Sequence, residues 1–250
     1  MSAGTARRLD QLLVERGLFD SREKARRAVM AGLVSVGGRR VDKPGTAVAA
    51  DALFAVAGPA EPFVSRGGRK LAAALDHFGL DPRELRCLDV GASTGGFTDC
   101  LLQRGASHVT ALDVGRGLID ARLRADPRVT VVERVNARHL AADDLGAPFD
   151  VVVVDVSFIS VVKVAPALLP HLVPGGRLLV LVKPQFEVGR GGVGKGGLVR
   201  DEELRRRVVA ERADELAALG LALVGTVDSA VPGAEGNVEA FALLVREVPV

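Results

Sequence analysis

Two charged residues stand directly after long apolar runs in this sequence. Asp155 follows the run VVVV, and Lys183 follows LLVLV. Removing a carboxylate or an ammonium group from water is costly unless the group is paired or takes part in chemistry. Both runs are typical of buried parallel strands, whose carboxyl ends meet at one edge of a sheet. We therefore predict that Asp155 and Lys183 face a shared ligand crevice.

Two further charged residues lie beside predicted elements of the same region. Lys70 lies in SRGGRKL, early in a predicted helix, and Glu239 opens the last predicted strand in GNVE. Taken alone, each is better explained as an ordinary solvated charge. Their interest depends on whether the fold brings them to the crevice of Asp155 and Lys183.

A glycine-rich turn joins the predicted strand 86–90 to the helix after it. The segment CLDVGASTGGF has the spacing GxxxGG, which differs from the GxGxxG of dinucleotide-binding proteins. Glycines let the backbone approach a ligand, and the following helix N-terminus favours a carboxylate. The spacing favours S-adenosylmethionine over NAD, although a purely structural turn remains an alternative. The candidate cofactor-binding residues are Asp89, Gly91, Ser93, Thr94, Gly95, Gly96 and Phe97.

Further cofactor contacts are expected at the ends of the next strands. Asp113 ends the second strand, 17 residues after Gly96, where an acid can accept hydrogen bonds from ribose hydroxyls. Asn136 and Ala137 follow the third strand and would lie beside the adenine. An ordinary strand-to-helix turn explains these last two equally well. Asp155 is expected to lie near the transferred methyl group.

The segment GRGGVGKG, residues 189–196, imitates a phosphate-binding loop. Its last position is Gly196, so the hydroxyl that binds magnesium in the pattern GxxxxGK[ST] is missing. No predicted helix begins directly after it. We reject a nucleotide triphosphatase and expect a mobile glycine-rich flap near the active site.

The alternation of elements predicts an α/β fold. Helices beginning near Gly67, Gly96, Gly117 and Val161 separate the predicted strands. A long helix, 201–220, precedes two final strands, of which the last is expected to run antiparallel. The prediction is a Rossmann-like methyltransferase sheet, mostly parallel, in a domain spanning residues 66–250. Its strands are predicted at 86–90, 108–114, 129–133, 150–156, 176–182, 221–229 and 239–247.

The first 58 residues differ from the rest in charge. They carry ten Lys and Arg against six Asp and Glu, whereas the remainder carries 23 against 25. We predict helices at 8–17 and 21–32 and short strands within 33–38, 39–48 and 52–58, followed by a linker at 59–65. A small basic α+β domain suits RNA binding, and a basic solvated surface is the equally weighted alternative. The candidate RNA-binding residues are Arg7, Arg8, Arg22, Lys24, Arg26, Arg27 and Arg66.

Composition excludes several classes of protein. Aromatic residues make up only 4% of the chain, with no Trp and no Tyr, which limits base capture by stacking. Cys87 and Cys100 form no CxxC pair, so we expect neither a disulfide framework nor a metal site, and a reducing cytoplasm suits them. The apolar stretch 164–182 is interrupted by proline and glycine, and no signal peptide is recognised, so no membrane association is expected.

Several motifs in order resemble the TlyA family of ribosomal-RNA methyltransferases, sometimes called hemolysins. The motifs are VSRGGRKL, LDVGASTGGFTDCLLQRGA, DVSFIS, LVKPQFEVGR and GNVE. The resemblance covers nearly the whole chain and implies a catalytic domain of the FtsJ type that uses S-adenosyl-L-methionine. It also implies an N-terminal domain that resembles the αL RNA-binding motif of a small-subunit ribosomal protein.

The resemblance implies catalytic roles for a tetrad of charged residues. The positions that match are Lys70, Asp155, Lys183 and Glu239. Lys183 is the candidate base, with a pKa lowered by desolvation and by the like charge of Lys70. Asp155 would hold the lysines near the methyl group, and Glu239 would orient a lysine or the ribose.

The implied reaction is 2′-O-methylation of a cytidine ribose in ribosomal RNA. The expected partner is ribosomal RNA or a ribosomal subunit, and the protein is expected to be a monomer. Members that modify both subunits tend to carry a further C-terminal helical segment. Because this sequence ends at Val250, soon after its last strand, we expect the large subunit as substrate. The alternatives are a membrane-active hemolysin, a non-catalytic ribosome assembly factor and, less favoured, an NAD oxidoreductase.

Overall fold

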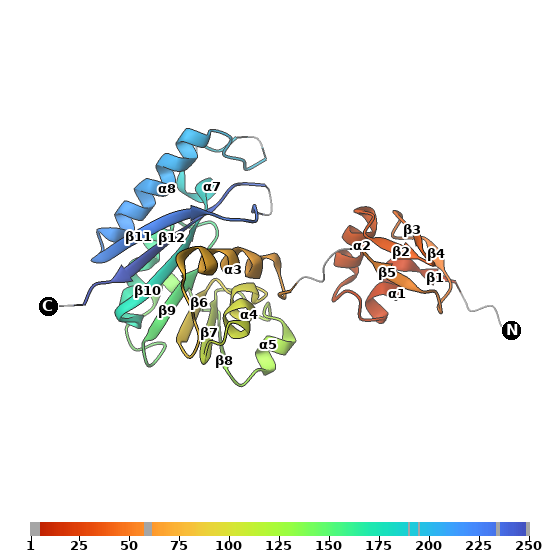
Figure 1. The fold of residues 1–250 in the computed structure, drawn as a ribbon, viewed down its shortest axis with the longest axis horizontal. Coiled ribbons are helices and arrows are strands. Elements are labelled where there is room, and N and C mark those ends of the chain that lie inside the picture. Colours follow the sequence, from red (N-terminus) through yellow and green to blue (C-terminus); the bar gives the residue numbers. More distant parts are fainter. Residues whose placement is uncertain (1–5, 58–61, 190, 195, 234–235, 249–250) are drawn as a thin grey trace. The chain divides into compact units, whose positions relative to one another are not determined.

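The structure is a computed structural model that describes residues 6–57, 62–189, 191–194, 196–233 and 236–248. The chain divides into two compact units, Met1–Ala60 and Glu61–Val250 (Figure 1). Each unit has a hydrophobic core of its own and is described by itself. No helix in the described ranges is both long enough and apolar enough to cross a membrane.

The first unit is a small α+β domain, as the sequence predicts. Its second helix begins after Ser21, whose hydroxyl accepts a hydrogen bond of 3.3 Å from the Lys24 amide, and ends near Gly32 at φ +68°. Both helices are shorter than expected, and β4, within the predicted segment 39–48, pairs with β1, a two-residue strand that the sequence pattern did not reveal. The elements are β1 (Arg7–Arg8), α1 (Leu9–Glu15), α2 (Arg22–Met30), β2 (Val34–Val36), β3 (Arg39–Arg40), β4 (Ala47–Val48) and β5 (Phe54–Val56).

The two helices of this unit pack together over a small core. Leu9 and Leu13 of α1 meet Ala25 and Val29 of α2, and all four are fully buried. The spacing of these residues, four apart in each helix, puts each pair on one helical face. The other face of α2 therefore carries its basic residues to the solvent.

Seven strands of the described chain form the sheet of the second unit, in the order β11-β12-β10-β9-β6-β7-β8. Strand β12 runs antiparallel to both of its neighbours, while the pairs β10–β9, β9–β6, β6–β7 and β7–β8 are parallel. The prediction of a mostly parallel sheet with an antiparallel last strand is confirmed. The strands are β6 (Arg86–Val90), β7 (His108–Asp113), β8 (Val129–Glu133), β9 (Phe149–Val154), β10 (Leu172–Val182), β11 (Leu221–Asp228) and β12 (Ala240–Arg246).

Helices cover both faces of this sheet. Along β9, Val151 and Val153 face the core beneath α3 (Arg66–Phe78), α4 (Gly96–Gln103) and α5 (Ala121–Ala125), whereas Val152 and Val154 face the opposite core. That second core lies beneath α6 (Ala165–Leu168) and α8 (Glu202–Ala217). Burial on both faces explains why β9 is a continuous valine run without polar alternation.

Two predicted helix starts shift in the structure. The helix expected near Gly117 is α5, which begins at Ala121 because the Asp120 carboxylate caps it, accepting 2.9 Å from the Arg122 amide. The helix expected at Val161 begins as the 3₁₀ turn η2 (Val161–Lys163) before α6. A short helix, α7 (Pro184–Glu187), follows β10 directly.

The strand order fixes the place of the ligand crevice. From β6 the sheet extends through β7 and β8 on one side and through β9 and β10 on the other. In an open parallel sheet, the crevice forms at the carboxyl ends of the strands where this direction reverses. The carboxyl ends of β6 and β9 are therefore the place where ligand-binding residues are expected to meet.

Candidate active site

A cleft of about 560 Å³ lies at this edge of the sheet. The structure brings the four residues of the predicted tetrad into its lining, together with most of the glycine-rich turn and Arg66. The predicted residues that line it are Arg66, Lys70, Asp89, Gly91, Ser93, Thr94, Gly96, Phe97, Asp155, Lys183 and Glu239.

The tetrad consists of two lysine–carboxylate pairs. The Lys70 ammonium lies 2.6 Å from Glu239 Oε2, with side-chain exposures of 11% and 3%. Lys183 pairs with Asp155 and donates a second hydrogen bond of 2.9 Å to Ser157 Oγ. Such desolvated charges remain stable only when each has a partner of opposite sign. The cleft therefore holds two ammonium groups and two carboxylates at low net charge.

The backbone positions each member of the tetrad differently. Asp155 follows β9 directly, and its amide donates 2.8 Å to the Val90 carbonyl of β6. Lys183 is the residue between β10 and α7, while Glu239 precedes β12 and bonds the Ser229 amide through its carbonyl. Lys70 lies in the second turn of α3. Four separate elements thus contribute one charged side chain each.

The glycines of the turn are required by close packing. A Cβ atom on Gly91, which has φ +85°, would lie 2.3 Å from the Asp155 carbonyl oxygen. A Cβ atom on Gly96 would lie 2.2 Å from Ser65 Oγ, just before α3. The remaining predicted glycine, Gly95, lies outside the lining and packs against Leu123 at φ +93°. The turn before α4 is thus packed closely against the residue that follows β9 and against the residue that precedes α3.

Asp89 supplies a buried acceptor to the cleft. Its side chain is fully buried, and Oδ2 accepts a hydrogen bond of 2.7 Å from Thr98 Oγ1. Oδ1 has no hydrogen-bond partner within the described part of the chain. Burial raises the pKa of Asp89 to about 7. An orphaned carboxylate oxygen in the lining fits the amino group of a bound amino-acid moiety.

Asp113 lies behind the glycine turn and not in the lining of the main cleft. Its two oxygens accept hydrogen bonds from the amides of Ser93, at 2.8 Å, and Gly115, at 2.7 Å. Ser93 has φ +49°, so this contact holds a non-glycine residue in a left-handed conformation. Each carboxylate oxygen keeps a second lone pair for a ribose hydroxyl. A small hollow beside it is lined by Asp113, Ser93 and Leu118.

Two predicted adenine contacts lie elsewhere. Asn136 is exposed, and its Oδ1 caps the 3₁₀ turn η1 (Ala137–His139) by accepting 3.1 Å from the Arg138 amide. Ala137 is buried in the hydrophobic core beneath α6. Neither lines the cleft, and their contact with the adenine stays a prediction.

Sequence reasoning missed an aromatic residue of the site. Phe158 lines the cleft with 90% of its surface exposed and adopts φ +64°, which is strained for an aromatic residue. Its ring centroid lies 5.0 Å from that of Phe186, which also lines the cleft. The motif DVSFIS was the available signal, but no sequence pattern reveals that its phenylalanine faces the solvent.

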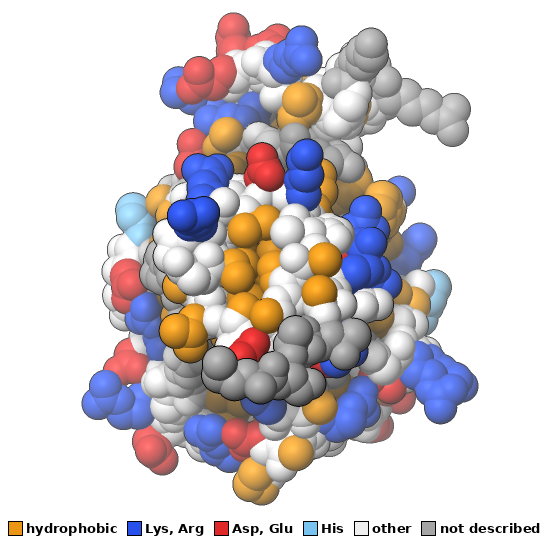
Figure 2. All heavy atoms as spheres, turned by 90° about the vertical axis from the view of Figure 1, so that its right-hand side faces the viewer, with side chains coloured by type: hydrophobic (Ala, Val, Ile, Leu, Met, Phe, Trp, Pro, Cys, Tyr) orange, Lys and Arg blue, Asp and Glu red, His pale blue; other side chains and the backbone are white. Residues whose placement is uncertain are grey.

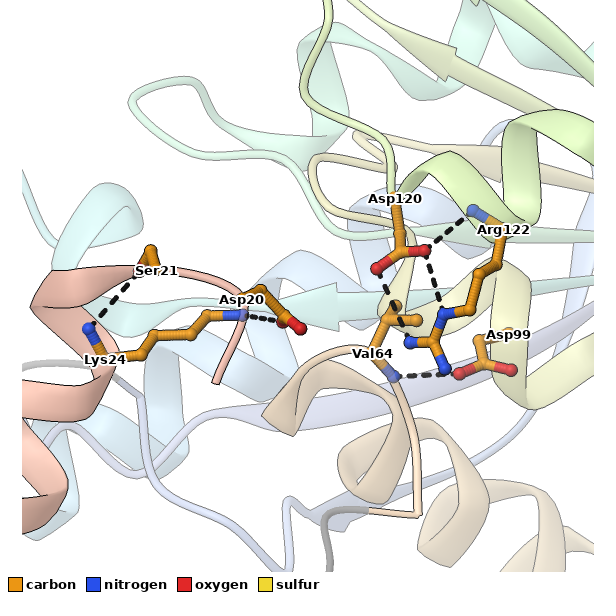
Figure 3. A network of polar contacts seen from close by, with 7 residues as sticks. All are labelled: Asp20, Ser21, Lys24, Val64, Asp99, Asp120 and Arg122. Carbon is orange, nitrogen blue, oxygen red and sulfur yellow. Dashed lines mark hydrogen bonds and ion pairs between the residues drawn. The ribbon is translucent and has the colours of Figure 1, made fainter. Parts of the chain in front are cut away.

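The basic residues of the first unit are mostly paired. Asp10 is fully buried and receives Arg8 Nε at 3.0 Å and Arg22 Nε at 2.9 Å, and the hydrogen bond from Arg8 lowers its pKa. Lys24 Nζ lies 2.8 Å from Asp20 (Figure 3). Within the described residues, Arg7 and Arg27 also have acidic partners, while Arg26 forms no ion pair.

The predicted linker, residues 59–65, is described only from residue 62. The Val64 amide donates 2.8 Å to the Asp99 carboxylate of α4 (Figure 3). Gln103 Nε2 bridges the Pro62 carbonyl, at 2.8 Å, and Asp99, at 2.9 Å. Residues 62–64 are therefore attached to the helix that begins at the glycine turn.

Both units of the chain are similar to known protein families. Residues 63–246 match the model of the FtsJ-like methyltransferases, and residues 7–53 match the S4 domain. The chain is 49% identical over 238 residues to the 16S/23S rRNA (cytidine-2′-O)-methyltransferase TlyA of Mycobacterium tuberculosis, covering 94% of this chain and 88% of that protein.

Two further relatives carry hemolysin names. Hemolysin A of Brachyspira hyodysenteriae is 39% identical, with 94% of this chain and 98% of that protein covered. A structure from Streptococcus thermophilus, solved under the name of a hemolysin, is 40% identical with a TM-score of 0.77 and covers 98% of this chain and 90% of its own.

The environment of Asp89 predicts a pH-dependent stability. Because its pKa in the fold, about 7, exceeds the ordinary value of 3.8, protonated Asp89 stabilises the fold, and this contribution is lost as pH rises from 3.8 through 7. We expect the free energy of unfolding of the ligand-free protein to fall more over this range than that of Asp89→Asn. Urea denaturation at several pH values measures both slopes, and equal slopes would contradict the assignment.

Proposed function

We propose, since this chain belongs to the FtsJ-like methyltransferase family, that it transfers the methyl group of S-adenosylmethionine to a ribose 2′-hydroxyl in ribosomal RNA. The observation that carries this proposal is the cleft in which two lysine–carboxylate pairs adjoin the glycine turn. A cytidine of the large subunit is the proposed target. The proposed location of the reaction is the cytoplasm.

The cofactor is proposed to bind along the carboxyl ends of β6 and β7. The free Oδ1 of Asp89 suits the amino group of the methionine moiety, and Asp113 suits the ribose hydroxyls. The close approach of the turn at Gly91 leaves the backbone accessible to the ligand. When bound, S-adenosylmethionine supplies a methyl group already activated by its sulfonium.

The tetrad is proposed to handle the nucleophile. A ribose hydroxyl is a poor nucleophile, so the protein has to align it and accept its proton. Lys183 in its neutral form is the proposed acceptor, and Asp155 stabilises the ammonium group that results. This requires the Lys183 ammonium group, which pairs with Asp155, to lose a proton before the transfer. The second pair, Lys70 with Glu239, is proposed to orient the ribose.

Phe158 is proposed to hold the target base. A phenyl ring exposed at the cleft, with Phe186 beside it, offers a flat apolar face to a base that has left its stack. Stacking tolerates any base, so this contact positions the nucleotide without selecting it. Arg66 at the start of α3 lies in the same lining and suits a phosphate.

The first unit, with proposed bounds 1–58, is proposed to bind the RNA through its S4 domain. A shallow surface of α2 is lined by Arg22, Glu23, Arg26, Arg27 and Met30. On the face drawn in Figure 2, lysine and arginine side chains are interspersed with acidic and apolar ones. Arg7, Arg8 and Lys24 complete the proposed set, in which Arg26 is ready to meet a phosphate without breaking an ion pair.

Cofactor identity can be tested by calorimetry. We expect S-adenosylmethionine and S-adenosylhomocysteine to bind, and Asp113→Ala to weaken binding roughly tenfold or more, because a hydrogen bond to a charged group contributes about 1.5–3 kcal/mol. Asp214→Ala, an exposed carboxylate on α8, is the control. Tight NAD binding without a response to either adenosyl ligand would overturn the assignment, and no binding of any of the three would indicate a non-catalytic assembly factor.

The role of α2 can be tested by the salt dependence of RNA binding. The double variant Arg26→Ala/Arg27→Ala should bind ribosomal RNA more weakly, with a salt slope smaller by about one for each phosphate that is no longer neutralised. Arg207→Ala, on the exposed face of α8, is the matched control. An unchanged affinity and slope in filter binding at several salt concentrations would remove α2 from the RNA-binding surface.

Lys183 can be tested by single-turnover methyl transfer. Lys183→Ala should lower the rate by about 10²–10⁴-fold, because general-base steps contribute that much, while cofactor affinity stays near that of the parent. Lys163→Ala, an exposed lysine of η2, should have little effect. A Lys183→Ala protein that transfers methyl at the parent rate would leave alignment alone to explain catalysis.

A further inference from the structure

The glycine-rich segment that follows α7 contributes to the cleft, yet the proposed reaction gives it no role. Val193 and Gly197 line the cleft beside Glu239. The segment offers few side chains for packing, and Gly196 and Gly197 adopt φ values of +79° and +78°. A stretch of glycines loses much conformational freedom when it is ordered. Something outside the segment has to hold it as a wall of the cleft.

Asn237 supplies that hold. Its side chain is almost fully buried, with 2% of the residue exposed. Nδ2 donates a hydrogen bond of 2.8 Å to the Gly197 carbonyl, and Oδ1 accepts one of 2.9 Å from the Val199 amide. Both ends of the amide are thus bound to the backbone of the glycine-rich segment. A buried amide with fixed partners at both ends is costly to disturb.

The same residue belongs to the turn that carries Glu239. The Asn237 carbonyl accepts 2.9 Å from the Gly233 amide, and two residues later Glu239 meets Lys70. A Cβ atom on Gly233 would lie 2.7 Å from Glu239 Oε1, so the backbone at Gly233 packs directly against this carboxylate. Asn237 therefore connects the wall of the cleft to a member of the tetrad.

The sheet order assigns this wall to one half of the cleft. The segment follows β10 and α7, and Asn237 precedes β12, which is the neighbour of β10. The glycine turn and Asp113 follow β6 and β7, on the other side of β9. The wall thus borders the tetrad and lies away from the strands assigned to the cofactor.

We propose that Asn237 is a positioning residue that fixes residues 197–199 as the wall holding the target nucleotide against the tetrad. The proposal rests on the proposed methyl transfer to RNA. Loss of the Asn237 amide releases the wall and lets the nucleotide shift relative to the methyl donor. A small misplacement of reacting groups lowers the rate steeply.

The first test combines kinetics with cofactor binding. Asn237→Ala should lower single-turnover methyl transfer by about tenfold or more, while the affinity for S-adenosylhomocysteine stays within the error of the parent value. Asn237→Asp keeps an acceptor for the Val199 amide but sets a carboxylate oxygen against the Gly197 carbonyl oxygen, so its rate should fall at least as far as that of Asn237→Ala. Ser229→Ala is the control, since Ser229 bonds the Val231 carbonyl at 2.8 Å in the same β11–β12 connection and no residue of the wall.

The second test is hydrogen exchange of the free protein, which needs no activity. The amides of residues 197–199 should exchange faster in Asn237→Ala than in the parent and in Ser229→Ala. Unchanged exchange, or a rate loss that is matched by an equal loss of cofactor affinity, would overturn the proposal. If the parent transfers no methyl group to ribosomal RNA, the proposed function fails, and the exchange experiment still decides whether Asn237 holds the wall.

Discussion

The ion pair between Lys70 and Glu239 joins two elements that are 169 residues apart in the chain. Glu239 is 2% exposed, so without the lysine its carboxylate would be a buried, uncompensated charge. Removing one partner of such a pair typically costs about 3–5 kcal/mol. The start of α3 and the start of β12 therefore have to meet at the carboxyl edge of the sheet. The rest of the site depends on this meeting, because α3 and β12 enclose the crevice from two sides.

The second pair is local, and the difference is informative. Asp155 and Lys183 directly follow the neighbouring strands β9 and β10, and because Val154 pairs with Val180, Lys183 lies two residues beyond the position opposite Asp155, on the same face and within reach of its side chain. The Asp155 backbone also limits the glycine turn, since its carbonyl leaves no room for a Cβ atom on Gly91. The glycine turn after β6 and the Asp155 backbone after β9 are therefore packed directly against each other.

The sequence was sufficient for the parts of the site that end apolar runs. Asp155 and Lys183 were recognisable because a charge after a buried strand needs a reason, and the glycine turn was recognisable by its spacing. Phe158 and Asn237 were not, because a phenylalanine at φ +64° and an asparagine bound to a distant backbone depend on tertiary contacts. Asn136 differs from both, since its side chain caps a local turn.

Counting charges also overstated how much of the first unit is free to bind a polyanion. Arg8 and Arg22 share the single carboxylate of Asp10, which leaves one excess positive charge on a rigid three-residue cluster. Since Asp10 is fully buried and both arginines are about half exposed, their free N–H groups face the solvent while the carboxylate cannot. For the proposed RNA-binding role, a phosphate that meets these N–H groups would not have to displace Asp10. Guanidinium groups fixed in advance lose less conformational entropy on binding than free side chains do. Asp10 thus reduces the net charge of this cluster but leaves both guanidinium groups accessible from the solvent.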